Sequence, residues 1–90
     1  LYRLGAATVT VGEGPGHVRD TELLLEECGL RSALREVGRT RFVDLNYDEV
    51  HRVKTTTRLT GLSELWLPRT VLAADVLISM PKIKTHHWAG

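Results

Sequence analysis

The sequence is poor in the residues that build cofactor clusters and membrane spans. Cys28 is the only cysteine in ninety residues. One cysteine excludes an internal disulfide, and it leaves no set of thiolates for a zinc site or an iron–sulfur cluster. No cofactor is therefore bound by a cysteine cluster in this segment, and the identity of any other cofactor is unknown. No apolar run approaches the roughly 18 residues that a membrane-spanning helix needs, and no signal peptide is visible. These absences predict a cytoplasmic protein without a membrane partner.

The sequence also lacks a strong charge of either sign. Twelve basic residues oppose eleven acidic ones, which gives a formal net charge of +1. Lysine and arginine are scattered along the chain, so no basic cluster marks a surface for nucleic acid or for an anionic membrane. A chain of this length buries only about 60 to 65 per cent of its unfolded surface, which limits the core. We therefore expect one small domain without a nucleic-acid partner.

Both ends of the sequence suggest a segment of a larger domain. Residues 1–5 (LYRLG) are typical of the last turn of a helix that closes on a left-handed glycine, Gly5. At the other end, the sequence stops directly after its most informative motif, MPKIKTHHWAG, at residues 80–90. We expect a single α/β segment over residues 1–90 that is truncated at both ends.

Hydrophobic patterning predicts an α/β fold with a mostly parallel sheet and crossover helices. Residues 7–11 (ATVTV) and 41–45 (RFVDL) predict two strands. Between them, Asp20 is a good N-cap for helical spacing that runs over residues 21–37 and is interrupted at Gly29. Either one kinked helix or two consecutive helices fit this pattern. A strand–helix–strand unit of this kind is expected to be parallel and right-handed.

The second half of the chain predicts a hairpin, a short helix and a last strand. Side chains alternate over residues 51–59, and a turn at Gly61 would return the chain through residues 65–67 as an edge β-hairpin. Pro68 suits the first turn of a short helix that ends at Ala74. Residues 75–79 (DVLIS) then predict a buried parallel strand.

Polar or glycine-rich residues follow each predicted parallel strand. Ligands of open α/β sheets bind outside the carboxyl ends of the strands, so we expect these residues to share one edge and to hold a small anionic ligand, phosphate or carboxylate. The pattern locates a site but does not name a reaction. The predicted ligand-binding residues are Gly12, Glu13, Gly14, Gly16, His17, Asn46, Lys82, Lys84 and Thr85, and the predicted catalytic residues are His86 and Asp44.

The glycine loop has two interpretations. Gly12, Gly14 and Gly16 allow backbone amides to approach a phosphate closely. However, the loop lacks the Gly-Lys-Ser/Thr ending of a P-loop, and Asp44 follows it by far more than the roughly 20 residues of a dinucleotide-binding unit. A plain tight turn, with Asp44 and Asn46 capping their own loop, is the alternative.

The terminal motif supplies the positive charge of the predicted site. Lys82 and Lys84 are two residues apart, so an extended segment projects both toward one anionic group, although a solvated basic face is the alternative. Thr85 could donate a hydroxyl group. His86 is the acid–base candidate because histidine titrates near neutral pH.

A metal site finds less support. His17 and His86 with one carboxylate, Glu13 or Asp44, would form a two-histidine, one-carboxylate set. No recognisable ligand spacing supports this set. His86 and His87 are adjacent and would face opposite ways in a strand, so they are also poor partners for one metal ion. The sequence therefore predicts no metal.

Four motifs, in this order, resemble the domain-of-unknown-function family 362. They are GEGPG at residues 12–16, VDLN at 43–46, LPRTVLAAD at 67–75 and MPKIKTHHWAG at 80–90. The most specific element is PKIKTH at residues 81–86. The resemblance runs through nearly the whole chain and implies an α/β protein whose activity is unassigned.

The resemblance also implies an alternative function. Some members of the family carry ferredoxin-type iron–sulfur modules beside this domain. The segment could therefore be a non-catalytic scaffold that docks an iron–sulfur module or subunit through its hairpin. An exposed face made of His51, Lys54, Arg58 and Trp66, together with carboxyl-edge loops that lack a hollow, would favour docking over ligand binding.

Overall fold

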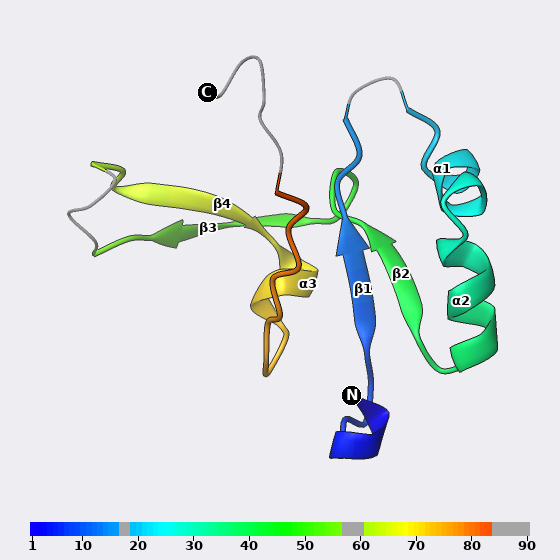
Figure 1. The fold of residues 1–90 in the computed structure, drawn as a ribbon. Coiled ribbons are helices and arrows are strands. Elements are labelled where there is room, and N and C mark those ends of the chain that lie inside the picture. The colour runs from blue at the N-terminus through cyan, green and yellow to red at the C-terminus, as the bar shows by residue number, and fades with distance from the viewer. Residues whose placement is uncertain (17–18, 57–60, 84–90) are drawn as a thin grey trace.

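The computed structural model describes residues 1–16, 19–56 and 61–83. Figure 1 shows two separate two-stranded sheets, with α1 and α2 beside β1 and β2, and α3 at the end of β4. This arrangement confirms a mixed α/β fold. It does not confirm a mostly parallel sheet, since the described residues hold one parallel and one antiparallel pair. The elements are η1 (Tyr2–Leu4), β1 (Thr10–Glu13), α1 (Thr21–Glu27), α2 (Leu30–Val37), β2 (Arg41–Asp44), β3 (Val50–Lys54), β4 (Glu64–Pro68) and α3 (Arg69–Leu72).

The first sheet pairs β1 with β2 in parallel. Thr10 lies opposite Arg41, and Glu13 lies opposite Asp44, so both strands end at the same edge. The ladder runs two residues beyond the predicted end of the first strand, because the amide of Leu45 still donates to the carbonyl oxygen of Glu13 at 2.8 Å. The pairing partner, rather than the β-branched composition, therefore sets the bounds of β1.

Two helices connect these strands, so the two-helix alternative is correct. Asp20 begins α1, since its Oδ1 accepts a hydrogen bond from the amide of Leu23 at 3.0 Å. Gly29 separates α1 from α2 in a left-handed conformation, with φ of 75°, which a residue without a Cβ adopts at low cost. Across this bend, Glu26 Oε1 lies 3.7 Å from Arg31 Nε and 3.6 Å from Arg35 Nη2.

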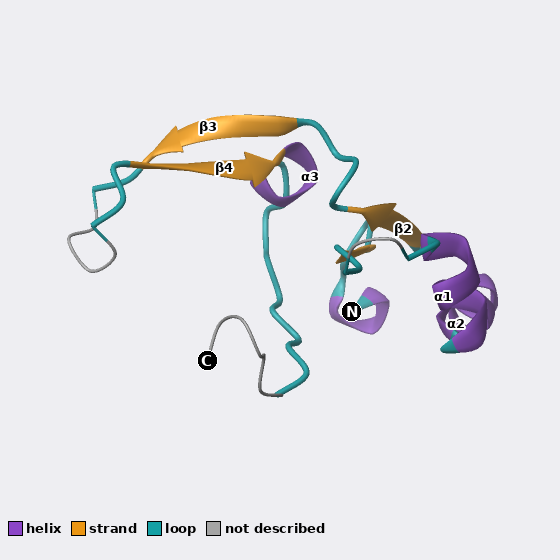
Figure 2. Cartoon of the chain, turned by 90° about the horizontal axis from the view of Figure 1, so that it is seen from above, coloured by secondary structure: helices purple, strands orange, loops and turns teal. Residues whose placement is uncertain are grey.

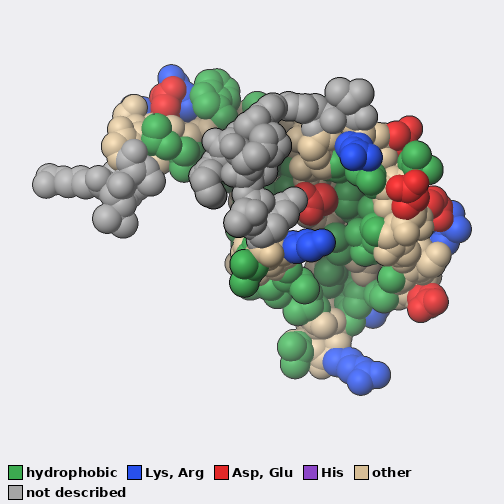
Figure 3. All heavy atoms as spheres, turned by 45° about the horizontal axis from the view of Figure 1, so that its top comes forward, with side chains coloured by type: hydrophobic (Ala, Val, Ile, Leu, Met, Phe, Trp, Pro, Cys, Tyr) green, Lys and Arg blue, Asp and Glu red, His purple; other side chains and the backbone are tan. Residues whose placement is uncertain are grey.

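The core of the described residues is very small. Leu25 of α1, at 4 % exposure, is the one buried hydrophobic side chain among them. Figure 3 shows apolar side chains over much of the visible surface, between acidic and basic ones. None of the described helices is both long enough and apolar enough to cross a membrane. Stability therefore depends heavily on the contacts of one leucine.

The hairpin prediction is confirmed, but its place in the fold differs. β3 and β4 pair antiparallel, with His51 opposite Leu67 and Lys54 opposite Glu64. They form a sheet of their own rather than the edge of the parallel sheet. The predicted first strand ran over residues 51–59, but β3 ends at Lys54, and residues 57–60 lie outside the described residues. Gly61, the predicted turn residue, has a left-handed φ of 64°.

The prediction of a buried parallel strand over residues 75–79 is wrong. These residues form no strand, and the side chains of Val76, Leu77 and Ile78 are 77 %, 67 % and 53 % exposed. A strand needs a neighbour whose backbone groups are free to pair. Figures 1 and 2 show this segment running apart from β1 and β2. Residues 75–79 therefore have the apolar, β-branched composition of a strand, but no free strand edge of the described residues lies beside them.

Asp48 caps α3, so the free energy of unfolding should depend on pH in the acidic range. Its Oδ2 accepts a hydrogen bond from the amide of Thr70 at 2.7 Å. The bonds from the Thr70 amide and hydroxyl hold the pKa of Asp48 below its ordinary value of 3.8. A depressed pKa in the folded state contributes stability above pH 3.8, and the contribution disappears as the pH falls through the lower folded value. Asp48→Asn should therefore flatten the loss of stability between pH 5 and pH 3.

Urea unfolding of both proteins at several pH values in this range measures the effect. Asp75→Asn, a change of the same chemistry at an exposed position outside the helices and strands, controls for the removal of one charge. Parallel pH profiles of the Asp48→Asn variant and the unsubstituted chain would contradict the capping role.

Candidate functional site

The glycine loop and the end of β2 meet at the carboxyl edge of the parallel pair. Asn46 Nδ2 donates a hydrogen bond to the carbonyl oxygen of Pro15 at 2.9 Å. A Cβ added at Gly14 would lie only 3.1 Å from Asn46 Oδ1, and one added at Gly12 would lie 3.1 Å from the side chain of Leu45. Both glycines therefore let the loop lie against the β2 end, and two of the three predicted regions come together.

Asp44 joins the end of β2 to the start of α1. Its Oδ2 accepts a hydrogen bond from the hydroxyl group of Thr21, the first residue of α1. Its Oδ1 accepts from the amide of Asn46 at 2.9 Å. One carboxylate thus holds the helix and the loop in fixed positions relative to each other.

A cavity of about 440 Å³ lies between the start of α1 and the end of β2. This volume falls within the range of about 300 to 1,000 Å³ that is typical of small-molecule sites. Among the predicted site residues that the structure describes, Asp44 is the one that lines this cavity. The cavity is lined by Arg19, Asp20, Thr21, Glu22, Phe42, Asp44 and Tyr47.

The three carboxylates of this cavity all have partners within the protein. Asp20 binds the amide of Leu23, Asp44 binds Thr21 and Asn46, and Glu22 forms an ion pair with Arg31. Arg19 is exposed, and no hydrogen bond or ion pair joins it to any other residue in the described ranges. Arg19 is therefore the lining cation that can contact a ligand, while Asp20 and Asp44 keep their negative charge because their partners are neutral groups.

Six of the seven lining residues were not predicted as site residues: Arg19, Asp20, Thr21, Glu22, Phe42 and Tyr47. Asp20 was predicted only as an N-cap, and Tyr47 follows the predicted site residue Asn46. For Tyr47, this position beside a predicted site residue was the available signal. The sequence alone does not show that the start of α1 faces the end of β2.

The other predicted residues are placed less closely together. Glu13 Oε1 accepts a hydrogen bond from the amide of Gly14 at 3.0 Å, and Gly16 has open space where a Cβ would lie. Lys82 lies on the exposed segment that runs apart from the parallel pair (Figure 2). The predictions for His17, Lys84, Thr85 and His86 fall outside the described residues. Within the described ranges, no three His, Cys, Asp or Glu side chains are grouped to hold a metal ion.

The hairpin does not present the proposed docking residues on one face. Lys54 and Trp66 are exposed, and His51 is exposed as well. Successive side chains of a strand point to opposite faces, so the pairing of Arg52 with Trp66 puts Trp66 and Lys54 on one face and His51 on the other. Arg58 lies outside the described residues. The face predicted for docking is therefore divided between the two sides of the hairpin.

Comparison with known proteins gives one match. Searches of the curated proteins and of the solved structures each returned no match. A family model, described as a domain of unknown function (DUF362), matches residues 1–90, which is the whole chain. This chain therefore belongs to the DUF362 family, as its motifs indicated.

Proposed function

We propose that this domain binds a small anionic ligand, one with a phosphate or carboxylate group, in the cavity between α1 and β2. The observation that carries the proposal is an unpaired cation among the described residues of the cavity wall. Each carboxylate there has a protein partner, whereas Arg19 has none among the described residues. A guanidinium group binds such oxyanions through two parallel hydrogen bonds.

The glycine loop supports the same ligand class. The amide of Gly14 already donates a hydrogen bond to a carboxylate oxygen, Glu13 Oε1, at 3.0 Å and at an exposed position. An oxygen of a bound phosphate or carboxylate can take the place of this oxygen at little cost, since both accept the same hydrogen bond. The loop therefore offers a backbone donor suited to an anion.

Arg19→Gln tests the proposal directly. The glutamine keeps a polar side chain but removes the charge, so the affinity for inorganic phosphate or acetate should fall about tenfold. Titration followed by the backbone amide signals of Gly14, Thr21 and Asn46 locates the binding. Arg3→Gln is the matched control, because Arg3 lies on η1 at an exposed position. Equal affinities of the Arg19→Gln and Arg3→Gln variants would refute the role of Arg19.

We propose that the terminal motif supplies further groups to the same ligand, although Lys82 belongs to the segment that runs apart from the parallel pair. Lys82 and Lys84 would neutralise ligand charge, Thr85 would donate a hydroxyl group, and His86 would transfer a proton if the ligand reacts. The titration above, repeated with a Lys82→Ala, Lys84→Ala double variant, examines this part separately from Arg19. Unaltered affinity in that variant would exclude the two lysines from the ligand site, and the proposal for the cavity would stand without them.

A docking function is the second candidate, and exposed apolar surface favours it. On one face of the hairpin, Trp66 is 62 % exposed and Val50 is 50 % exposed. A partner that covers these side chains, such as an iron–sulfur module, would gain their hydrophobic contacts. The phosphate and acetate titration distinguishes the two functions, since a pure docking domain predicts no change in the amide signals around the cavity.

A further inference from the structure

A second cavity, of about 270 Å³, lies at the amino end of β2, the opposite end from the proposed ligand site. Three arginines line it: Arg31 and Arg35 from α2, and Arg41 from the first position of β2. Thr40 adds a hydroxyl group to the wall, and no carboxylate is among the lining residues. The arginines that are scattered along the sequence are thus gathered by the fold.

Local geometry explains why the three arginines meet. Arg31 and Arg35 are four residues apart on a helix, so they share one face. Gly38 ends α2 with φ of 82°, and the chain then enters β2 at Arg41. Arg41 is held in place, because its Nε donates to the Thr10 hydroxyl oxygen at 3.0 Å, which leaves its two terminal nitrogens for a ligand.

The surrounding charges leave this cavity positive. Arg31 and Arg35 contact Glu26, and Arg31 also pairs with Glu22. The Arg35–Glu26 pair is exposed on both sides, at 73 % and 52 %, so it is weak and readily exchanged. The Arg31–Glu22 pair is kept, because Arg31 is only 24 % exposed, and the second terminal nitrogen of Arg31 is left for a ligand. Outside the lining, Arg39 lies over the ring of Tyr2 at 4.4 Å and adds another cation to the same corner.

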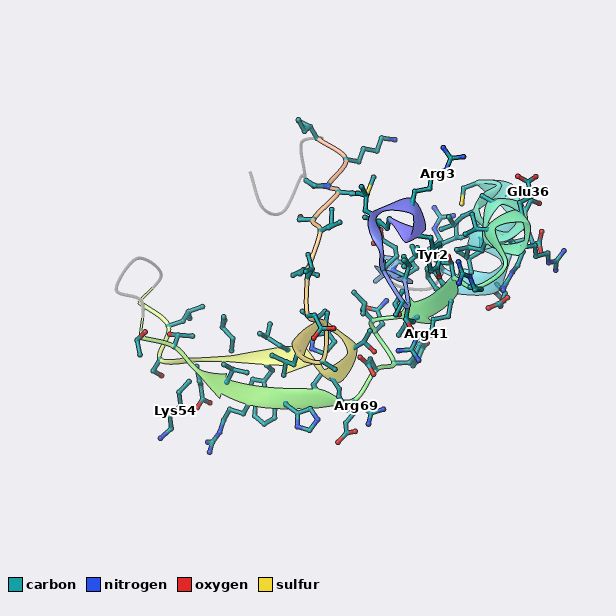
Figure 4. All side chains as sticks on the ribbon, turned by 90° about the horizontal axis from the view of Figure 1, so that it is seen from below. Tyr2, Arg3, Glu36, Arg41, Lys54 and Arg69 are labelled. Atoms are coloured by element: carbon teal, nitrogen blue, oxygen red, sulfur yellow. The ribbon has the colours of Figure 1, made fainter. Side chains whose placement is uncertain are left out.

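The side-chain view agrees with this placement. Figure 4 shows Arg41 and Tyr2 near the strands, whereas Glu36 points away on the far side of α2. Glu36 therefore does not offset the charge of the cavity. A small group with two negative charges could contact several guanidinium groups at once. It should therefore bind this cavity more strongly than the singly charged side chain of an exposed glutamate does.

We propose that this guanidinium cavity binds a dianionic tetrahedral group, the phosphate of a phosphomonoester or inorganic phosphate itself. Arg31, Arg35 and Arg41 donate to its oxygens, and the Thr40 hydroxyl group, which lies 3.4 Å from the Tyr2 hydroxyl group, turns to donate as well. The two cavities share Phe42 in their walls, but their ligands are held by different arginines, so either site can exist without the other.

Titration of the whole chain with inorganic phosphate, and then with phenyl phosphate, tests this proposal. The amide signals of Gly38, Thr40 and Arg41 should shift in both titrations, with phenyl phosphate distinguishing a phosphomonoester site from one restricted to free phosphate. Arg35→Gln should weaken binding at these signals about tenfold. Arg52→Gln is the matched control, because Arg52 is exposed and pairs with Glu64 at 3.6 Å, the same distance as the Arg35–Glu26 pair.

The outcomes separate this site from the proposed function. Arg19→Gln should not change the phosphate response of the Gly38, Thr40 and Arg41 signals, and Arg35→Gln should not change that of the Gly14, Thr21 and Asn46 signals. Silent signals at Gly38, Thr40 and Arg41 during both titrations, or equal affinity in the Arg35→Gln and Arg52→Gln variants, would overturn the guanidinium site. A missing phosphate-induced shift at Gly14, with the shifts at Gly38, Thr40 and Arg41 present, would refute binding in the carboxyl-edge cavity and support the guanidinium site.

Discussion

Replacing Leu25 by alanine should destabilise the domain by about 2 to 4 kcal/mol, the largest effect expected of a single truncation in the described residues. Leu25 is the one hydrophobic side chain there that is buried, at 4 % exposure. Its removal takes away apolar contacts and leaves a cavity that the small core fills only in part. Because native domains are stable by roughly 5 to 15 kcal/mol, a loss of this size should lower the urea midpoint strongly.

Leu23→Ala provides the matched control. Leu23 lies on the same helix, two residues before Leu25, but is 58 % exposed. Its truncation should change the free energy of unfolding by no more than about 0.5 kcal/mol. Both variants keep helix propensity nearly constant, since leucine and alanine are both good helix formers. Similar destabilisation by the two truncations would show that Leu25 is not the centre of the core.

Replacing Asp44 by alanine should have the second-largest effect, about 2 kcal/mol on stability together with a loss of ligand binding at the carboxyl edge. The substitution removes the acceptor of two hydrogen bonds, from the Thr21 hydroxyl group and from the Asn46 amide. The start of α1 and the loop after β2 then lose their common anchor. Unfolding free energies and the phosphate response of the Gly14 amide measure the two consequences.

A double-mutant cycle with Thr21→Val isolates the contact between helix and strand. Valine keeps the shape of threonine without the hydroxyl group, so the coupling energy with Asp44→Ala reports their hydrogen bond. We expect a coupling of about 1 kcal/mol. Additive effects would mean that Asp44 acts through Asn46 alone. Asp44→Asn, which keeps one oxygen acceptor, should fall between the alanine variant and the unsubstituted chain.

Local features of the fold were predictable from the sequence because short-range chemistry decides them. The Asp20 cap, the interruption at Gly29 and the hairpin over β3 and β4 all depend on residues close to one another in the chain. In the candidate site, the approach of the glycine loop to Asp44 and Asn46 follows from parallel pairing of two strands. That pairing makes the carboxyl ends of both strands meet at one edge.

Features that depend on distant partners were not predictable in the same way. Residues 75–79 have the composition of a buried strand, but composition does not say whether a strand edge is free beside them. Arg19 and Tyr47 join the cavity only because α1 begins beside the end of β2. Arg31, Arg35 and Arg41 likewise form a group only after α2 is placed next to β2.

The bend at Gly29 should make the angle between α1 and α2 depend on ionic strength. Glu26 and Arg35 are nine residues apart, a rise of about 13.5 Å in an uninterrupted helix. The bend brings their side chains to 3.6 Å, and Arg31 shares the same carboxylate. Since dissolved ions screen exposed pairs of this kind, the angle between the two short helices should relax slightly as ionic strength rises.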